Sequence, residues 1–329
     1  MFFLQTLLAT LFSSTCCQTH SSIGPRLGSL ETTGVSSVYK LSKPIKLQNQ
    51  SNITIEGDSI IGGALPCILL INCSHITITN CKLVNSKDIG IRLQGCSRII
   101  IENNEIGNVK AGVFAIMCPL GGIRVLNNQM KNMIGPSPQA DFVQFDRVSG
   151  ANNQISSNRL ENVLGGSKAE DAINLYMSDG LPGDPILVAY NRIRGGGPSI
   201  TGAGITAGDG GGSYQHIENN IVVNSGSGGI QVAGGTNIQI TNNIIYSKSL
   251  AWSSFGLASS NYSGKPSDNN TVSYNKVNWI AGRLGGIRRD TVYKPGTGAN
   301  VNAMPTGWRT NTVDTQLGEN VLPVKIIDF

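Results

Sequence analysis

The feature that most constrains this chain is a short strand-like unit that recurs along most of its 329 residues. The clearest copies read ITITNCKL at 76–83, IIIENNEI at 99–106 and IRVLNNQM at 123–130, and an earlier copy, ITIEGDSI, stands at 53–60. The sixth positions of successive units are Asp58, Cys81, Asn104, Asn128, Asn158, Asn191, Asn220, Asn243 and Asn275. They are separated by 23, 23, 24, 30, 33, 29, 23 and 32 residues, which is a period of 23 residues with loops added in some units. A period of this length predicts a repeat architecture.

A second strand-like segment lies within each unit, at 90–94, 112–116, 142–146, 172–176, 204–208 and 229–233. Apolar and polar residues alternate there, as in a strand with one buried face. The period is too short for a βαβ unit of roughly 30 residues or a propeller blade of about 40. Stacked coils of parallel strands do fit, because each coil buries its apolar face against its neighbours. The sequence therefore predicts an all-β fold, a single parallel β-solenoid of about eight to nine coils and roughly 40 Å in length.

Two columns of side chains follow from this register. The sixth-position asparagines would stack along one turn, where each amide can bond to the amides above and below it. Cys73, Cys96 and Cys118 are spaced by 23 and 22 residues and would form a column of small buried side chains. No CxxC pair occurs, so the sequence carries no zinc-site signature, and a disulfide between stacked cysteines stays open.

The Ile-x-Ile-x-Asn-Asn-x-Ile units resemble the right-handed parallel β-helix repeats of the pectate-lyase-like superfamily, over roughly residues 36–280. The resemblance implies a right-handed β-helix. The superfamily contains polysaccharide lyases, epimerases, glycoside hydrolases, phage tailspikes and adhesins, so the resemblance specifies the fold rather than one function. The motifs of polygalacturonases, alginate epimerases and the better-known pectate lyases are absent, so no catalytic residue carries over from the resemblance.

The chain divides into four predicted regions. Residues 1–17 are typical of a signal peptide, because an apolar run over 2–12 precedes small residues, and Cys16 or Cys17 could carry a lipid anchor. Residues 18–35 are a flexible N-terminal segment, 36–280 the β-helix with its N-terminal cap, and 281–329 a C-terminal cap. No other stretch is apolar enough for a membrane span. We therefore expect a monomeric protein that is secreted or held in the cell envelope.

Irregular coil lengths locate a candidate site. From the sixth-position residue to the centre of the next strand takes 9 residues in the regular coil, from Asn104 to Val113. It takes 15, 15 and 14 residues in the following three coils, so extra loops fall near 131–140, 161–170 and 194–203. A further insertion lies at 177–185. Insertions in repeat proteins gather on one face, often the binding face.

Polar side chains occupy the predicted outward positions of these coils. The predicted substrate-binding residues are Gln144, Arg147, Asn174, Thr206 and Asp209, and the predicted catalytic residues are Asp146, Lys168, Asp171 and Tyr176. Carboxylates, amides, a phenol and cations in one groove suit a carbohydrate, whose hydroxyls need polar partners. The sequence therefore predicts a polysaccharide groove along the coil axis.

Two reaction classes fit this set. Proton abstraction beside a uronate carboxylate needs a base, such as Lys168 or Tyr176, and a cation, such as Arg147, and we favour this lyase or epimerase chemistry. Hydrolysis needs two carboxyls instead, and the candidates are Asp146, Asp171, Asp179 and Asp209. Calcium is the one cofactor that the sequence suggests, on Asp146 and Asp171. The alternatives are a non-catalytic glycan-binding, adhesive or structural envelope protein, with Asp141 and Asp171 as ordinary turn residues.

Charge is sparse and uneven. Only 14% of the residues are charged, but the stretch 276–310 contains six basic residues and one acidic residue, Asp290. This stretch could attract an anionic polymer, or it could be a solvated cap whose charges keep the open end of the solenoid from stacking. We favour the cap. The stretch lacks the interleaved aromatic residues of a nucleic-acid groove, so no nucleic-acid partner is expected.

Overall fold

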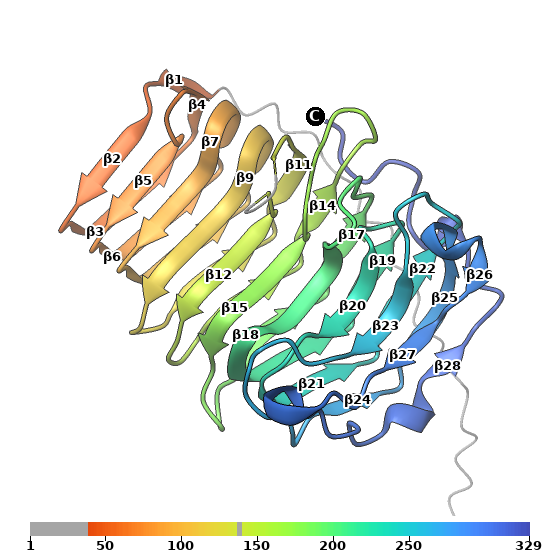
Figure 1. Cartoon of the computed structure of the whole chain (residues 1–329). Coiled ribbons are helices and arrows are strands. Elements are labelled where there is room, and N and C mark those ends of the chain that lie inside the picture. The colour runs from red at the N-terminus through yellow and green to blue at the C-terminus, as the bar shows by residue number, and fades with distance from the viewer. Residues whose placement is uncertain (1–38, 137–139) are drawn as a thin grey trace, which may run out of the picture. The chain divides into compact units, whose positions relative to one another are not determined.

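The computed structural model describes residues 39–136 and 140–329, and residues 38–329 form one compact unit. The predicted signal peptide (1–17), the candidate lipid anchor at Cys16 or Cys17, and the segment 18–35 lie outside the described residues. Within that unit the predicted all-β fold is confirmed, because parallel strands stack in register into coils around one apolar core (Figure 1).

The coils present three parallel sheets. Sheet 1 contains β2 (Ile45–Gln48), β5 (Ile68–Ile71), the ends of β7 (Lys82–Gln94) and β9 (Glu105–Cys118), β12 (Val143–Val148), β15 (Ile173–Asp179), the start of β18 (Ala203–Glu218), β20 (Gly228–Val232), β23 (Phe255–Ser259) and β27 (Thr291–Tyr293). Sheet 2 contains β3 (Ser51–Glu56), β6 (Ser74–Thr79), β8 (Ser97–Glu102), β10 (Ile123–Leu126), β13 (Gln154–Ser156), β16 (Ile186–Ala189), the end of β18, β21 (Thr236–Thr241) and β24 (Thr271–Ser273).

Sheet 3 contains β1 (Lys40–Ser42), β4 (Asp58–Gly63), the starts of β7 and β9, β11 (Gln129–Met133), β14 (Arg159–Glu161), β17 (Arg192–Arg194), β19 (Ile221–Val223), β22 (Ile244–Ser247), β25 (Lys276–Ala281) and β28 (Thr312–Val313). The short β26 (Ile287–Arg288) pairs antiparallel with β25. Four 3-10 turns, η1 (Gly282–Leu284), η2 (Gly298–Asn300), η3 (Trp308–Thr310) and η4 (Glu319–Val321), follow β25 along the chain.

The core consists of columns of inward side chains, one from each coil. On sheet 1 the paired residues Val113, Val143, Ile173, Ile205 and Ile230 are all fully buried. Because side chains alternate along a strand, burial of these positions turns the residues beside them outward. This alternation positions the polar residues of sheet 1 that form the candidate site.

The Asn-Asn pairs of the repeat have two separate structural roles. The first residue of each pair, such as Asn103 (φ 57°) or Asn127 (φ 53°), adopts the left-handed conformation that turns the chain between two sheets. Among residues other than glycine, asparagine tolerates this conformation best. The second residue points inward and joins a column of buried amides. One dipeptide thus supplies both the turn and the contact between coils.

The predicted asparagine column is confirmed from Asn104 to Asn275. Each side-chain amide donates to the carbonyl oxygen of the next one, at 2.9 Å from Asn104 to Asn128 and 3.1 Å from Asn128 to Asn158. Each carbonyl oxygen also accepts the backbone N–H of the preceding asparagine. The column then extends to Asn311, to which Asn275 donates at 2.7 Å, within the region predicted as a cap.

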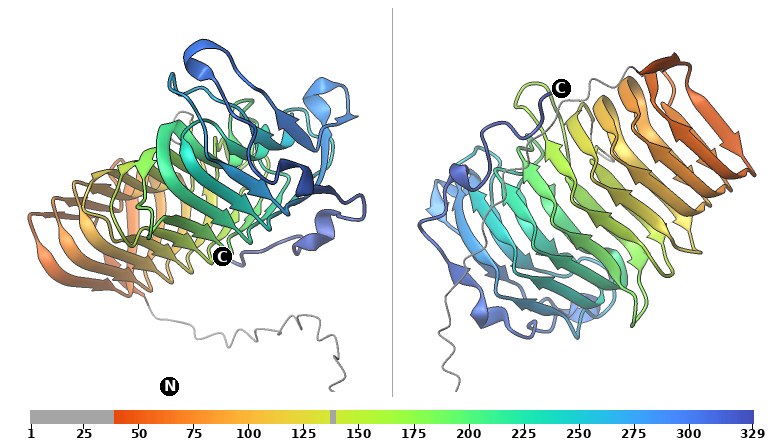
Figure 2. Two further views of the ribbon diagram at one scale, coloured as in Figure 1. Left: turned by 90° about the horizontal axis from the view of Figure 1, so that it is seen from below. Right: turned by 180° about the vertical axis from the view of Figure 1, so that it is seen from behind.

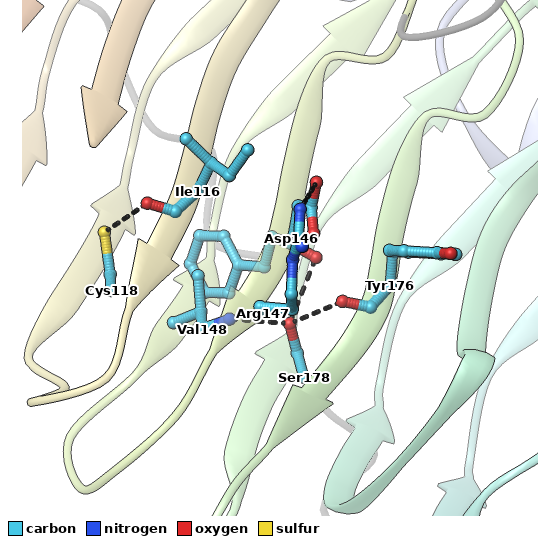
Figure 3. Close-up of polar contacts among 8 residues, drawn as sticks. Ile116, Cys118, Asp146, Arg147, Val148, Tyr176 and Ser178 are labelled. Carbon is cyan, nitrogen blue, oxygen red and sulfur yellow. Dashed lines mark hydrogen bonds and ion pairs between the residues drawn. The ribbon is translucent and has the colours of Figure 1, made fainter. Parts of the chain in front are cut away.

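The cysteine column is also present. The backbone N–H of Cys73 donates to Sγ of Cys96 at 3.4 Å, and Cys118 occupies the same position one coil further on. All five described cysteines are buried free thiols, and burial raises the pKa of Cys118 to about 12. The column continues through Val148, whose N–H donates to the hydroxyl oxygen of Ser178 (Figure 3). These thiols therefore pack as small apolar groups.

Residues 281–329 add strands to the stack and then return along it. β27 extends sheet 1 and β28 extends sheet 3, while the fully buried Trp279 and the partly buried Trp308 pack against the core. Residues 319–329, which we name the C-terminal strap, then run back across sheet 3 (Figure 2). None of the helices in the described part of the chain is long and apolar enough to cross a membrane.

Candidate functional site

A cleft of about 660 Å³ opens on the C-terminal half of sheet 1. It lies over the strands from β12 to β27, which are drawn in yellow to blue in Figure 1. Its floor comes from outward side chains of these strands. Its walls come from the inserted loop before β18 and from the segment that follows β25. Loops mounted on a rigid scaffold commonly carry function.

Seven of the nine predicted site residues line this cleft: Gln144, Asp146, Asp171, Asn174, Tyr176, Thr206 and Asp209. The other two do not line it. Lys168 is exposed on the loop before β15, where its backbone N–H donates to the carbonyl oxygen of Met133. Arg147 is exposed at the end of β12 and turned to one side by a left-handed backbone (φ 55°).

The centre of the floor is a second column of polar residues, which we name the cleft ladder: Gln144, Asn174, Thr206 and Gln231, paired strand to strand. The Gln231 amide donates to the Thr206 hydroxyl at 3.0 Å, and Thr206 donates to Asp171 at 2.9 Å. The side-chain oxygens of Gln144 and Asn174 are buried and have no partner in the described part of the chain. Because unpaired buried acceptors are costly, these two oxygens are suited to accept hydrogen bonds from a ligand.

Asp171 lies at the centre of the hydrogen-bonded network. Its carboxylate accepts from the backbone N–H of Ala203, from the Thr206 hydroxyl and from the Asn174 amide. Burial raises the pKa of Asp171 to about 7, against the lowering effect of these hydrogen bonds. Asp171 therefore changes between acid and carboxylate near neutral pH.

Asp141 lies next to Asp171 on the neighbouring coil. Its carboxylate accepts the backbone N–H of Asp171 at 3.0 Å. Burial, with the nearby Asp171 carboxylate second, raises the pKa of Asp141 well above its usual value. From sequence, both Asp141 and Asp171 could also be ordinary turn residues that bond to their own backbone. In the structure their carboxylates accept backbone N–H groups of the following coil, while both also line the cleft.

Asp171 and Asp209 share one donor. The Asn174 amide nitrogen donates to Asp171 at 2.8 Å and to Asp209 at 3.1 Å. The two accepting oxygens therefore lie no more than about 5.9 Å apart, which is the sum of the two bond lengths. One carboxyl with a raised pKa beside a second carboxyl is an arrangement that supports acid–base chemistry.

Asp146 and Tyr176 come from neighbouring strands and are paired in register (Figure 3). The Arg147 guanidinium binds the Asp146 carboxylate through two nitrogens, at 2.8 and 3.2 Å. This contact with the Asp146 carboxylate raises the pKa of Arg147 further. Tyr176 is paired in turn with Asp209. The carboxylates and the phenol thus line one side of the floor.

Basic residues form the opposite wall of the cleft. Arg283, Arg289 and Lys294 line it, and all three come from the segment after β25. The Arg283 guanidinium donates to the carbonyl oxygen of Ile200 at 3.2 Å, which links this segment to the inserted loop. Lys294 Nζ lies 3.3 Å from the hydroxyl of Tyr262. The cleft therefore has an acidic floor and a basic wall.

This basic wall differs from what the sequence pattern predicts. From sequence, the basic stretch 276–310 was favoured as a solvated cap, because no repeat register shows where its side chains point. Its excess of cations was the available signal. Gln231 was also not predicted, although it follows the same alternation as Gln144 on its own coil.

The residues of the floor do not form a metal site. No three His, Cys, Asp or Glu side chains within residues 39–136 and 140–329 are grouped to hold a metal ion. Asp171, one of the two proposed calcium ligands, already receives three hydrogen bonds from protein donors. A calcium ion at Asp171 would compete with these donors for the carboxylate oxygens.

Comparison with known proteins identifies the fold. Residues 45–181 match a family model described as a right handed beta helix region. The match covers less than half of the chain, but the same coils continue in register to β27 and β28. The chain is therefore a right-handed parallel β-helix protein, as the repeat units predicted. No curated protein and no solved structure gave a significant match.

Proposed function

We propose that this protein is an enzyme that cleaves an acidic polysaccharide in the cleft of sheet 1, by acid–base catalysis between carboxyl groups. The observation that carries the proposal is the buried Asp171, whose pKa of about 7 allows it to donate a proton at neutral pH, beside Asp209. The β-helix fold is common among proteins that handle glycans, which supports the substrate class. The acidic floor suits the reaction, and the basic wall suits the charges of the polymer.

Each residue has a defined role in this proposal. Asp171 is the acid that protonates the leaving oxygen as the glycosidic bond breaks, and Asp209 is the nucleophile that forms a covalent bond to the anomeric carbon. Water, activated by Asp171, then attacks that carbon and releases Asp209. The unpartnered oxygens of Gln144 and Asn174 accept hydrogen bonds from sugar hydroxyls. Arg283, Arg289 and Lys294 bind the carboxylates of the polymer.

The separation of the two carboxyls favours one stereochemical outcome. Retaining glycosidases place their carboxyls about 5–5.5 Å apart, and inverting enzymes place them roughly 6.5–9.5 Å apart. The upper limit of about 5.9 Å between the nearest oxygens of Asp171 and Asp209 falls with the retaining class. We therefore propose retention of the anomeric configuration, which proton NMR of the first product detects.

A lyase is the second candidate, and Tyr176 is the observation that favours it. Its side chain lines the cleft beside Asp209, where it could remove a proton next to a uronate carboxylate held by the basic wall. The sequence alone favoured this chemistry. The cleft makes hydrolysis the first candidate, because Lys168 lies outside the lining while four aspartates lie within it.

The test is a panel of acidic polysaccharides with three readouts. New reducing ends without ultraviolet absorbance indicate hydrolysis, and absorbance of unsaturated uronates indicates a lyase. An unchanged chain length with altered uronate signals in NMR indicates an epimerase. Binding without any product would reject the enzyme and leave the non-catalytic glycan-binding protein. Secretion or envelope attachment is also a proposal, and it depends on residues 1–17.

A further inference from the structure

A second depression lies on sheet 2, on a different side of the coils from the cleft. It has a volume of about 470 Å³ and lies over β6, β8 and β10. We name it the basic groove. Its lining includes His75, Thr77, Arg98, Ile100, Leu120 and Arg124. None of the residues that line it is acidic, in contrast to the cleft.

The two arginines of the basic groove lie on neighbouring strands, two positions apart along the strand direction. His75 and Arg98 occupy equivalent positions on neighbouring strands, and Arg124 lies one strand further, opposite Ile100. Neighbouring strands are about 4.8 Å apart, which is roughly the length of one sugar unit. Successive charges of an extended polymer can therefore meet successive side chains.

Neither arginine of the groove is neutralised by a carboxylate. The ion pairs within residues 39–136 and 140–329 include neither Arg98 nor Arg124. Arg124 contacts the side-chain oxygen of Gln154 at 3.4 Å, and Arg98 is exposed. Both guanidinium groups are thus available to bind a planar anion through two nitrogens.

The backbone at Arg98 makes a left-handed turn that brings the side chain next to Gly122. Arg98 has a φ of 52°, in a row of turn positions that includes Asn52, Gly122 and Asn152. Arginine is disfavoured in this left-handed conformation, whereas glycine and asparagine accept it. Gly122 in turn leaves room for Arg98, because a Cβ at Gly122 would lie 2.9 Å from the Arg98 Cα and 3.2 Å from its Cγ.

We propose that the basic groove is a second, non-catalytic binding site for an acidic polysaccharide, which holds carboxylate or sulfate groups of the polymer. Ile100, Leu120 and Ala151 provide the apolar surface against which the faces of sugar rings pack. No Phe, Tyr or Trp side chain is among the described residues that line the groove, so it lacks the large stacking surface that single-stranded nucleic acid uses. The proposal does not depend on the reaction in the cleft, since the two sites share no residue.

The test measures binding by affinity electrophoresis in gels that contain polygalacturonate, dextran sulfate or neutral dextran. We expect the double variant Arg98→Gln/Arg124→Gln to bind the acidic polymers about tenfold more weakly, since two charge-assisted contacts are lost. The matched control is Arg159→Gln/Arg192→Gln, a paired arginine couple on sheet 3 that removes the same charge. The control should bind within about twofold of the parent protein. Neutral dextran should not retard any variant.

A second variant separates binding from folding. Arg98→Gly places the residue best suited to φ 52° at this position, so the free energy of unfolding should stay the same or rise while binding weakens. The preference between polygalacturonate and dextran sulfate assigns carboxylate or sulfate as the ligand group. Equal losses in the groove and control variants, or unchanged binding in the groove variant, would overturn the proposal. Retention by RNA or by anionic lipid vesicles, with none by either acidic polymer, would overturn it too.

Discussion

The asparagine column and the cleft ladder are both rows of polar side chains at equivalent positions of successive coils. They differ in how completely these side chains are hydrogen-bonded. In the asparagine column every coil contributes the same side chain, and each amide bonds to the next. In the cleft ladder the coils contribute Gln144, Asn174, Thr206 and Gln231, and two oxygens are left without partners. Repetition with complete pairing therefore gives the scaffold, and a change of residue type with incomplete pairing gives a place for a ligand.

The largest expected effect concerns the cleft. Asp171→Asn should lower activity on the cleaved polysaccharide by about 100- to 10,000-fold, because an amide cannot protonate the leaving oxygen. Steady-state rates measure this loss. The free energy of unfolding of the same variant, from urea titration, is the control for a merely structural effect. Activity within about threefold of the parent would remove Asp171 from the mechanism and would leave the cleft ladder as a binding surface.

The next effect concerns the asparagine column. Asn158→Ala should lower the free energy of unfolding by about 3–4 kcal/mol, because each buried group that loses its partner costs roughly 1–3 kcal/mol. The unpaired groups would be the N–H donors of Asn128 and the carbonyl oxygen of Val125. The matched control is Asn127→Gly, at an exposed left-handed turn position, which should cost less than about 1 kcal/mol. Equal losses in the two variants would show that the column contributes no more than the turn.

The pH dependence of stability separates the asparagine column from the hydrogen-bonded network around Asp171, which contacts the cleft ladder. Asp171 has a pKa raised to about 7 in the folded state, so its protonated form favours folding. This contribution is complete below the ordinary aspartate pKa of about 3.9 and is lost as the pH rises toward 7. Stability should therefore fall across this window, with a slope of about 1.4 kcal/mol per pH unit for one such group. Urea titrations at pH 4.5, 6 and 8 measure it.

The asparagine column has no titrating group, so it contributes nothing to this slope. Asp171→Asn should reduce the loss of unfolding free energy with rising pH. We assign the remaining pH dependence to Asp141, whose pKa is also raised. An identical slope in parent and variant would mean that Asp171 titrates near its ordinary pKa. The rate of the cleft reaction should also decline above pH 7 in the parent, since the acid is then deprotonated.

The smallest effect is expected at Lys168. Lys168→Met should change the rate by less than about twofold, because the side chain is exposed and does not line the cleft. The same rate assay with saturating polymer measures it. A loss of 100-fold or more would restore the lysine as a base and favour the lyase.

The fold could be predicted from sequence because the determinants of each coil are local. The alternation of Ile and Val with polar residues, and the Asn-Asn turn, are complete within each period, so the register of the coils follows from spacing alone. The same alternation placed Gln144, Asn174 and Thr206 on one face. The asparagine column was predicted up to Asn275, where the visible repeat ends.

The rest of the site depends on contacts that spacing does not encode. Arg283 and Lys294 reach the cleft only because the segment after β25 forms a wall there. Asn311 joins the asparagine column from a stretch without repeat spacing. The outward turn of Arg147 and the raised pKa of Asp171 follow from backbone conformation and burial, which a linear pattern does not give.

The C-terminal strap has a consequence for how this protein opens. The Arg194 guanidinium on β17 donates to two carbonyl oxygens of the strap, those of Glu319 and Leu322. The Glu161 carboxylate on β14 accepts two of its N–H groups, and Lys131 on β11 donates to Phe329. A stack held only by adjacent contacts can unzip coil by coil from either end. Here the C-terminal strap connects β11, β14 and β17, and it is synthesised after all three strands. Unfolding that starts at β2 should therefore stop at the strap, before it reaches the coils that carry Asp171 and Asp209.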